Sequence, residues 1–451
     1  MTNDILSSDE LESLAKKVVA LSSSEWCEVG INSSHNANLR YAANTVTTGG
    51  SSVNTAVHIT CASGKRSGSV SSNDLSDDGL SRAVKRAEEI SKLAPENEEL
   101  VPPIGAKQNY LRSAQFDESS ADYSYGASER ARIADHAIKE ARARKYVTAG
   151  FIETIVARTA FANSKGLFVT DEKTRSVFST TMRTSDGSSS GWNKRASHAI
   201  ARLDAERAIT RAAEKCAAWK SPTELDPGVY RTILEPSAAA DMVQEFVFSL
   251  NARDAEEGRS PFSRSAGATA LGEQVAAPNV RIYSDPNHPL APAGIYTGSG
   301  MPTEQIDWVN SGKIANFTRS RYWAEKTGKR AVPGPANIIM EGGNQLPEDF
   351  LTTVKEGLLI TSFWYIRDVD MQSMLKTGLT RDGVYWIKNG EIKYAVTNFR
   401  WNESPINVLK NVEEMSKQVV TAPRDGDDST PMMVPMMVVS KFNFSSISDA
   451  V

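Results

Sequence analysis

Val384-Tyr385-Trp386-Ile387-Lys388-Asn389-Gly390-Glu391-Ile392-Lys393-Tyr394 is the stretch that best indicates how the second half of the chain folds. Apolar and polar residues alternate in it, and a period of two is typical of a strand with one buried face. A type I′ turn needs a positive φ at both central residues, which Asn389-Gly390 tolerates well. The stretch therefore predicts a two-stranded hairpin in an antiparallel sheet.

Further strands and helices are predicted around this hairpin. A second hairpin is expected at Ile306-Asp307-Trp308-Val309, which turns at Asn310-Ser311-Gly312 into Lys313-Ile314. Three helices interrupt the strands, and a proline at or near the first position is favourable for each of them. They are predicted from Pro236 to about Arg253, from Pro347 onward with apolar Phe350, Leu351, Val354 and Leu358, and after the N-cap Ser404. An acidic loop at 421–431 and a final apolar strand at Met432 to Val439 follow.

The first half has its own alternation of helices and strands. Ser7-x-x-Glu10 is a capping box that begins a first amphipathic helix. Strands are predicted within 26–70 and at 147–161, 167–171 and 176–184, and helices at 77–93, 127–144 and about 195–219. The Pro/Gly/Asp-rich stretch Ser221 to Gly228 is the predicted boundary. We expect an α+β protein of two domains, 1–222 and 223–451, the second built around an antiparallel sheet.

Composition excludes several classes of protein. The chain has 451 residues, 51 Lys+Arg against 55 Asp+Glu, and a formal net charge of -4, so it lacks the basic footprint of a nucleic-acid-binding protein. Its apolar stretches are shorter than the roughly 18–20 residues that span a bilayer. Cys27, Cys61 and Cys216 are isolated from one another and predicted to be buried, free thiols in a reducing cytosol. We therefore expect a cytoplasmic protein that binds neither nucleic acid nor membrane.

Two kinds of catalytic site have weak support. The chain has 5 histidines, and the nearest two along the chain, His35 and His58, are 23 residues apart, so no local zinc motif exists. Gly187-Ser188-Ser189-Ser190-Gly191 matches G-x-S-x-G formally. A nucleophile elbow requires a strand-to-helix turn with a later histidine. The match lies in a Ser-rich loop, while His198 is expected on a helix and His288 in a Pro-flanked loop.

A set of short motifs nevertheless resembles a known family over nearly the whole chain. They occur, in order, as Gly64-Lys65-Arg66-Ser67-Gly68, Asn73-Asp74-Leu75, Asn163-Ser164-Lys165-Gly166, Glu257-Gly258-Arg259-Ser260-Pro261-Phe262, Leu271-Gly272-Glu273-Gln274-Val275, Gly300-Met301-Pro302-Thr303, Asn310-Ser311-Gly312, Lys355-Glu356-Gly357-Leu358 and Asn389-Gly390-Glu391-Ile392. Together they resemble the TldD/PmbA family, also called the modulator-of-gyrase or TldD/TldE peptidase family. The resemblance implies one of two related subunits. A TldD-like subunit is a zinc metallopeptidase with H-E-x-x-x-H on a helix and a later Cys ligand, and a TldE/PmbA-like subunit lacks this motif and pairs with it.

The resemblance places this chain on the side without the motif. Anchored without gaps on Gly258 and Phe262, the three motif positions fall on Val243, Gln244 and Phe248, and residues 420–430 contain no cysteine. Valine and phenylalanine have no donor atom for Zn²⁺. A glutamine amide cannot take a proton from metal-bound water. We expect no catalytic residue and no metal in this chain, with zinc in a TldD-like partner.

The resemblance predicts a function with two alternatives. The leading prediction is a non-catalytic, zinc-less subunit of a heterodimeric metallopeptidase that acts on small or unfolded peptides. The first alternative is a homodimer that binds peptides without cleaving them. The second is a metal-independent hydrolase that uses a serine from a Ser-rich loop.

Overall fold

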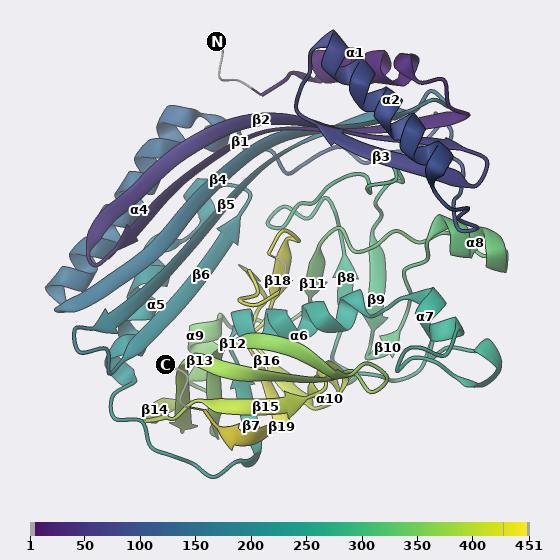
Figure 1. Cartoon of the computed structure of the whole chain (residues 1–451). Coiled ribbons are helices and arrows are strands. Elements are labelled where there is room, and N and C mark those ends of the chain that lie inside the picture. The colour runs from purple at the N-terminus through teal and green to yellow at the C-terminus, as the bar shows by residue number, and fades with distance from the viewer. Residues whose placement is uncertain (1–4, 427, 449–451) are drawn as a thin grey trace.

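The protein is α+β, as the sequence predicts. A computed structural model describes residues 5–426 and 428–448. One long, curved sheet from the first half arches over the second half, which contains two further sheets (Figure 1). The division into two domains at residue 222 stays a prediction.

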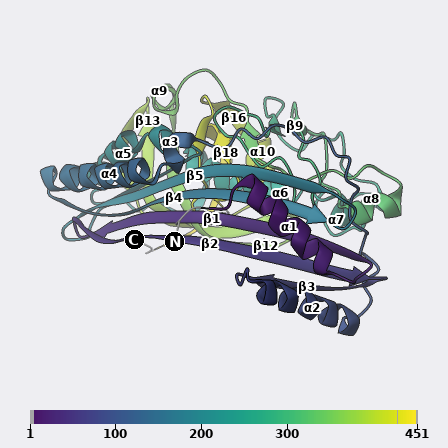
Figure 2. The same ribbon diagram turned by 90° about the horizontal axis from the view of Figure 1, so that it is seen from above.

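The arched sheet has six strands in the order β3-β2-β1-β4-β5-β6, and all neighbours are antiparallel. Its strands are β1 (Trp26–Ala42), β2 (Thr45–Ser63), β3 (Arg66–Ser72), β4 (Tyr146–Asn163), β5 (Phe168–Thr184) and β6 (Ser190–Ser197). Figure 2 shows β1, β2, β4 and β5 running side by side along the length of the molecule. The two segments expected at 167–171 and 176–184 are one continuous strand, β5.

Helices cover one face of this sheet. They are α1 (Ser8–Leu21), α2 (Asp77–Leu93), the single turn α3 (Glu118–Ala121), α4 (Tyr123–Ala143) and α5 (Ala205–Ala218). The predicted capping box begins α1, because the Glu10 N–H donates to Ser7 Oγ and the Ser7 N–H donates to Glu10 Oε2. Even-numbered residues of β4 and β5, such as Ile152 and Phe178, pack against α4 and α5.

The opposite face of the sheet points toward the second half of the chain. Successive side chains of a strand point to opposite faces. The odd-numbered residues Phe161 and Val169 therefore lie on this face, where they pack against Ile295. Alternation along β4 and β5 separates a helix-covered face from a face available for a site.

The prediction of a helix at 195–219 is wrong for residues 195–204. Residues up to Ser197 form strand β6, and the helix α5 starts only at Ala205. The Ala- and Arg-rich composition favours helix, but β6 pairs with β5 over eight register positions, from Ser176↔Ser197 to Arg183↔Ser190. Sheet pairing thus overrides local propensity here. His198, expected on a helix, lies in the bend after β6.

Five strands of the second half close into a ring. The pairings run β12–β7, β7–β19, β19–β15, β15–β13 and β13–β12, with β14 and β16 attached outside the ring. The strands are β7 (Gly228–Leu234), β12 (Glu356–Asp370), β13 (Leu375–Lys388), β14 (Glu391–Val396), β15 (Phe399–Glu403), β16 (Val412–Met415) and β19 (Met437–Ile447). Phe363, Trp401 and Phe442 are buried against one another within this ring. Closure leaves few unpaired strand edges.

The third sheet has the order β10-β9-β8-β11-β18-β17. Its strands are β8 (Ile282–Ser284), β9 (Ile306–Asn310), β10 (Lys313–Ile314), β11 (Ile338–Met340), β17 (Val419–Thr421) and β18 (Met432–Val434). The helices of this half are α6 (Pro236–Phe248), α7 (Ala252–Glu256), α8 (Arg321–Thr327), α9 (Pro347–Leu351) and α10 (Pro405–Lys410). Short 3-10 turns lie at Ile200–Arg202 and Ser265–Gly267.

Both predicted hairpins are confirmed. Asn389 and Gly390 have φ of 54° and 75°, and Ser311 and Gly312 have φ of 51° and 76°. Positive φ at both central residues is what a type I′ turn requires.

Three element lengths differ from the prediction. Helix α6 ends at Phe248 because Asn251 caps a separate helix, accepting hydrogen bonds from the backbone of Arg253 and Asp254. Helix α9 ends at Leu351, so Leu358 belongs to β12. The stretch 432–439 forms parts of β18 and β19 rather than one strand, and Pro435, which has no N–H, lies at the break.

The close contact between β6 and α5 gives the first testable prediction. A Cβ at Gly191 would collide with the backbone of α5 at Ala212 and Cys216. We expect Gly191→Ala to lower the free energy of unfolding by about 1–3 kcal/mol, as overpacking does. Urea denaturation measures the change. Gly30→Ala is the control, because its added Cβ meets nothing within 4 Å. Equal stability of the two variants would contradict the contact.

Candidate functional site

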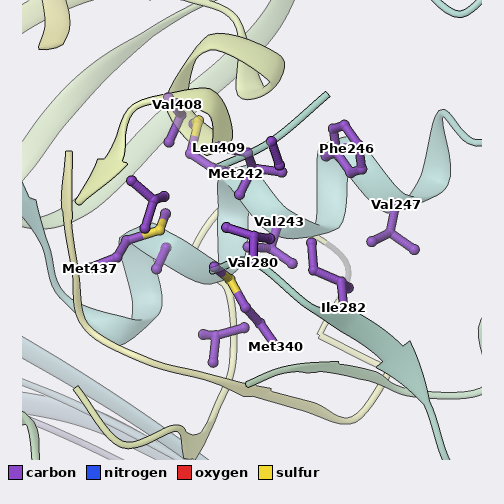
Figure 3. Packing of buried hydrophobic residues seen from close by; sticks show 14 of the residues in the cluster. Met242, Val243, Phe246, Val247, Val280, Ile282, Met340, Val408, Leu409 and Met437 are labelled. Carbon is purple, nitrogen blue, oxygen red and sulfur yellow. The ribbon is translucent and has the colours of Figure 1, made fainter. Parts of the chain in front are cut away.

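Helix α6 lies in the middle of the second half and is enclosed on most of its surface. Its residues Met242, Val243, Phe246 and Val247 are fully buried. Figure 3 shows them among side chains from both sheets and from α10, namely Val280, Ile282, Met340, Val408, Leu409 and Met437. The prediction of an apolar, buried helix is confirmed.

The structure does not bring the first and last predicted motif positions together. Val243 is fully buried in the core, whereas the side chain of Phe248 is 47% exposed. Five residues along an α-helix correspond to a rotation of about 140°. The two side chains therefore leave α6 on different faces.

The middle position, Gln244, is in contact with a loop. It is 3% exposed, and its Nε2 donates to the sulfur of Met432 at 3.6 Å. A Cβ on Gly426 would collide with Gln244 Oε1, so a larger residue there would force the end of the Gln244 side chain to move. The loop covers α6 at Gln244.

A buried carboxylate fastens the same loop to α6. Asp241 is 1% exposed, and its Oδ1 accepts hydrogen bonds from the backbone N–H groups of Asp425 and Gly426, both at 3.2 Å. Its Oδ2 has no partner among the described residues. Burial raises the pKa of Asp241 to about 7, although the backbone hydrogen bonds oppose this rise. The sequence shows Asp241 as one of two acids, with Glu245, in an otherwise apolar helix, which was a signal for a buried carboxylate.

The acidic loop predicted at 421–431 is anchored by ion pairs. Asp428 forms ion pairs with Arg175 Nη2 at 2.9 Å and Lys194 Nζ at 2.8 Å, across to the arched sheet. Burial opposes ionisation of Asp428, but Lys194 and Arg175 keep its pKa below the ordinary value. Asp427 lies outside the described residues.

The motif positions do not fit a zinc ion. Val243 and Phe248 contribute only carbon, and Gln244 contributes only a neutral amide, whereas zinc sites use thiolate, imidazole or carboxylate ligands. Over residues 5–426 and 428–448, no three His, Cys, Asp or Glu side chains are grouped closely enough to hold a metal ion.

Three neighbouring cavities, which we call together the trench, border the second half, and the central one is also lined by the arched sheet. The middle part of the trench, which we name the central cavity, has a volume of about 330 Å³ and is lined by residues that include Asp171, Lys173, Arg175, His198, Tyr296 and Met432. One end, the arginine cavity, has a volume of about 190 Å³ and is lined by residues that include Asn193, Arg195, Arg202, Arg207, Arg211 and Glu235. The other end, the outer groove, has a volume of about 630 Å³ and is lined by residues that include Phe248, Asn251, Thr297 and Tyr322.

These three spaces lie next to one another. The central cavity shares Ala196 and Val420 with the arginine cavity and Thr297 with the outer groove. Pro236, the first residue of α6, lines the arginine cavity, and Phe248, the last, lines the outer groove. The two ends of α6 therefore border the two outer spaces.

The walls of the central cavity carry both donors and acceptors. Asp171 Oδ2 accepts hydrogen bonds from Gln115 Nε2 at 2.8 Å and from the Ile295 N–H at 3.1 Å. Burial and the positive charge of Arg175 lower the pKa of Lys173. Burial and nearby Arg202 lower the pKa of His198, whose Nδ1 has no partner among the described residues. Such walls suit a polar, extended ligand.

The serine of the G-x-S-x-G match is not available to a substrate. Ser189 is fully buried at the start of the turn into β6, and its hydroxyl donates to the carbonyl of Cys216. The match therefore lies between two strands and not between a strand and a helix, as an elbow requires. Cys27, Cys61 and Cys216 are buried and free, as predicted.

Comparison with known families accounts for most of the chain. Residues 27–91 match the model for PmbA/TldA metallopeptidase domain 1, residues 111–217 the central domain, and residues 227–446 the C-terminal domain. The chain belongs to the PmbA/TldD metallopeptidase family. The resemblance found in the sequence is thereby confirmed.

Individual PmbA/TldD relatives cover nearly the same extent. The metalloprotease PmbA of Escherichia coli O157:H7 is 23% identical over 388 residues, which are 82% of this chain and 81% of that protein. The crystal structure of TldE from Thermococcus kodakarensis has a TM-score of 0.84 at 18% identity, covering 96% of this chain and 99% of that one. A proposed modulator of a DNA gyrase from Thermotoga maritima has a TM-score of 0.79 at 18% identity, covering 96% and 100%. These structures share the fold.

Among the described residues, no helix has both the length and the apolar character that crossing a bilayer demands.

The buried carboxylate gives a prediction about pH. Because the pKa of Asp241 is raised to about 7 in the folded state, the folded protein binds this proton more tightly than the unfolded chain does. Its contribution to stability is therefore fully present at acidic pH and is lost as pH rises from about 4 to about 7. Asp241→Asn removes this loss, on the order of 4 kcal/mol at most. Urea titrations at several pH values measure it.

Asp135→Asn, on the exposed face of α4, is the control for that experiment. We expect it to keep the pH dependence of the wild-type protein. A wild-type pH profile in the Asp241→Asn variant would contradict the raised pKa.

Proposed function

We propose that this chain is the non-catalytic, zinc-free subunit of a two-subunit PmbA/TldD metallopeptidase. It would act in the cytoplasm, which suits its three free thiols, together with a TldD-like subunit that holds the zinc. The substrates would be small or unfolded peptides, bound along the trench.

One observation carries this proposal, namely the packing of α6. Val243 points into the core, Gln244 is covered by the loop at Gly426, and Phe248 points to the outer groove. The helix that would hold zinc in a TldD-like subunit serves here to support one side of the trench. The trench itself supports peptide binding because its three cavities lie next to one another and the central one carries both hydrogen-bond donors and acceptors.

The same trench supports a second candidate function, a homodimer that binds peptides and does not cleave them. The chain would then need no zinc subunit. A metal-independent serine hydrolase has less support, because Ser189 is buried and bonded to a backbone carbonyl.

Purification of the chain alone and together with a TldD-like partner tests these functions. We expect neither stoichiometric zinc nor peptide cleavage from the chain alone, and both from the pair. Zinc analysis and cleavage of a fluorogenic unstructured peptide, with and without a chelator, are the measurements. Stoichiometric zinc and cleavage by the chain alone would overturn the proposal. Stable homodimers that bind peptide and gain nothing from the partner would favour the second candidate.

Rebuilding the motif tests whether the helix can return to zinc chemistry. We expect Val243→His, Gln244→Glu and Phe248→His together to give no zinc-dependent activity, because residues 420–430 supply no cysteine ligand and the groups that would orient the new imidazoles are missing. The imidazole at position 243 would lie in the apolar core without a partner, at a cost of roughly 1–3 kcal/mol. Zinc titration and urea denaturation are the measurements.

Phe248→His alone is the matched control, because that side chain is already 47% exposed. We expect it to leave the stability close to that of the wild-type protein. Full zinc-dependent cleavage by the triple variant would show that α6 can rearrange and would refute this account.

A further inference from the structure

The arginine cavity contains an unusual arrangement of charge. Four arginines line it, Arg195 from β6, Arg202 from the turn before α5, and Arg207 and Arg211 from α5, together with Asp204, Glu235 and Glu348. The cavity lies where α6 begins, at one end of the trench.

Most of these charges are already paired. Glu235 forms ion pairs with the buried Lys215 and with Arg211 Nη2, the latter at 3.6 Å. Arg207 forms ion pairs with Glu348 at 3.4 Å and with Asp204 at 3.9 Å. Asp204, Glu235 and Glu348 therefore have other cations as ion-pair partners, although their charges also act on Arg195. Glu348 Oε2 has no hydrogen-bond partner among the described residues.

Arg195 is the exception. Its side chain is only partly exposed, and it makes no hydrogen bond or ion pair with any of the residues that the structure describes. A guanidinium carries five N–H donors and remains charged at any physiological pH. Burial lowers the pKa of Arg195, although the charges of Asp204, Glu348 and Glu235 oppose this fall. A bound anion would stabilise the charged guanidinium of Arg195.

A second unpaired polar group lies beside Arg195. Asn193 is two residues earlier on β6, so both side chains lie on the same face of the strand, about 7 Å apart along it. Asn193 is 9% exposed, and its Oδ1 has no hydrogen-bond partner among the described residues. The cavity thus offers unpaired donors and, next to them, an unpaired acceptor.

The backbone adds to the attraction for an anion. Helices α5 and α6 both begin at this cavity, and within the described part of the chain no side chain caps either of them. Their first N–H groups and their dipoles favour negative charge.

From this geometry we propose that the arginine cavity binds the C-terminal residue of a peptide, with its α-carboxylate on Arg195 and its backbone N–H on Asn193 Oδ1. A peptide terminus supplies an anionic acceptor and a donor close together, whereas an inorganic oxyanion such as phosphate supplies mainly acceptors. Arg195 and Asn193 lie on the α5 side of β6, since Arg195 is paired with Phe178. Ala196 and Val420 line both this cavity and the central cavity, so the last residue of a peptide in the central cavity would reach Arg195 around the edge of β6. The inference rests on the proposed binding of peptides to this trench and adds the end that is recognised.

Binding of matched peptides to the full chain tests the inference. The probe is an unstructured peptide of about ten residues with a fluorophore at its N-terminus, made with a free or an amidated C-terminus, and fluorescence anisotropy measures its affinity. We expect the free form to bind roughly ten-fold more tightly or better, as charge-assisted hydrogen bonds allow. Arg195→Gln removes this preference without weakening the amidated form. Asn193→Ala weakens both forms, because both retain the backbone N–H.

Arg183→Gln is the matched control, since Arg183 lies on the neighbouring strand β5 and lines none of the three parts of the trench. It should keep the preference of the wild-type protein. Equal binding of the two peptides to the wild-type chain would overturn the inference and leave the peptide-binding role intact, and this comparison needs no variant. Binding of neither form would overturn both. Displacement of the free peptide by inorganic phosphate, but not by chloride at equal ionic strength, would assign the cavity to phosphate and overturn the carboxylate assignment.

Discussion

The hydrogen bonds between the buried carboxylate of Asp241 and the loop of residues 423–428 hold together parts of the molecule that are distant in sequence. At Asp241 the loop is fastened to α6. At Arg424 it is fastened to the five-strand ring through Asp382, 2.5 Å away. At Asp428 it is fastened to the arched sheet. One short loop therefore joins α6, the five-strand ring and the arched sheet. Its residue Asp428 also lines the central cavity.

The same loop explains how α6 can remain in place without catalytic residues. A helix enclosed by two sheets is stabilised by the apolar area that it buries, and Val243 contributes to that area where a polar ligand would not. Gln244 fills the space beside Gly426. The helix can thus support the fold without carrying zinc ligands. In this chain the contacts of α6 are those of a helix that supports the fold.

Local chemistry determined what could be predicted from the sequence. The Asn389-Gly390 turn and the Ser7 capping box depend on neighbouring residues, and both were predicted correctly. Residues 195–197 were misjudged because their strand conformation comes from pairing with β5, which is a long-range contact. The split of Met432 to Val439 into two strands depends on their different partners, although Pro435 was a local signal for it.

The candidate site divides in the same way. Positions 243, 244 and 248 could be found because a motif has a fixed spacing along one helix. Asn193 and Arg195 could not be found, because they stand out only by lacking hydrogen-bond partners in the folded cavity. A sequence does not show which polar groups lack partners. Asp241 is the intermediate case. The sequence shows it as an acid in an apolar helix, but only the structure shows that it accepts a hydrogen bond from the Gly426 N–H.

The contact between Gly426 and Gln244 also has an evolutionary consequence. The amide oxygen of Gln244 occupies the place that a side chain at position 426 would need, so a larger residue there requires the end of Gln244 to move or a smaller residue at position 244. A lineage with this pair regains a metal ligand in the loop most readily when position 244 changes first. The order of substitutions is then constrained, and positions 244 and 426 should vary together among its descendants.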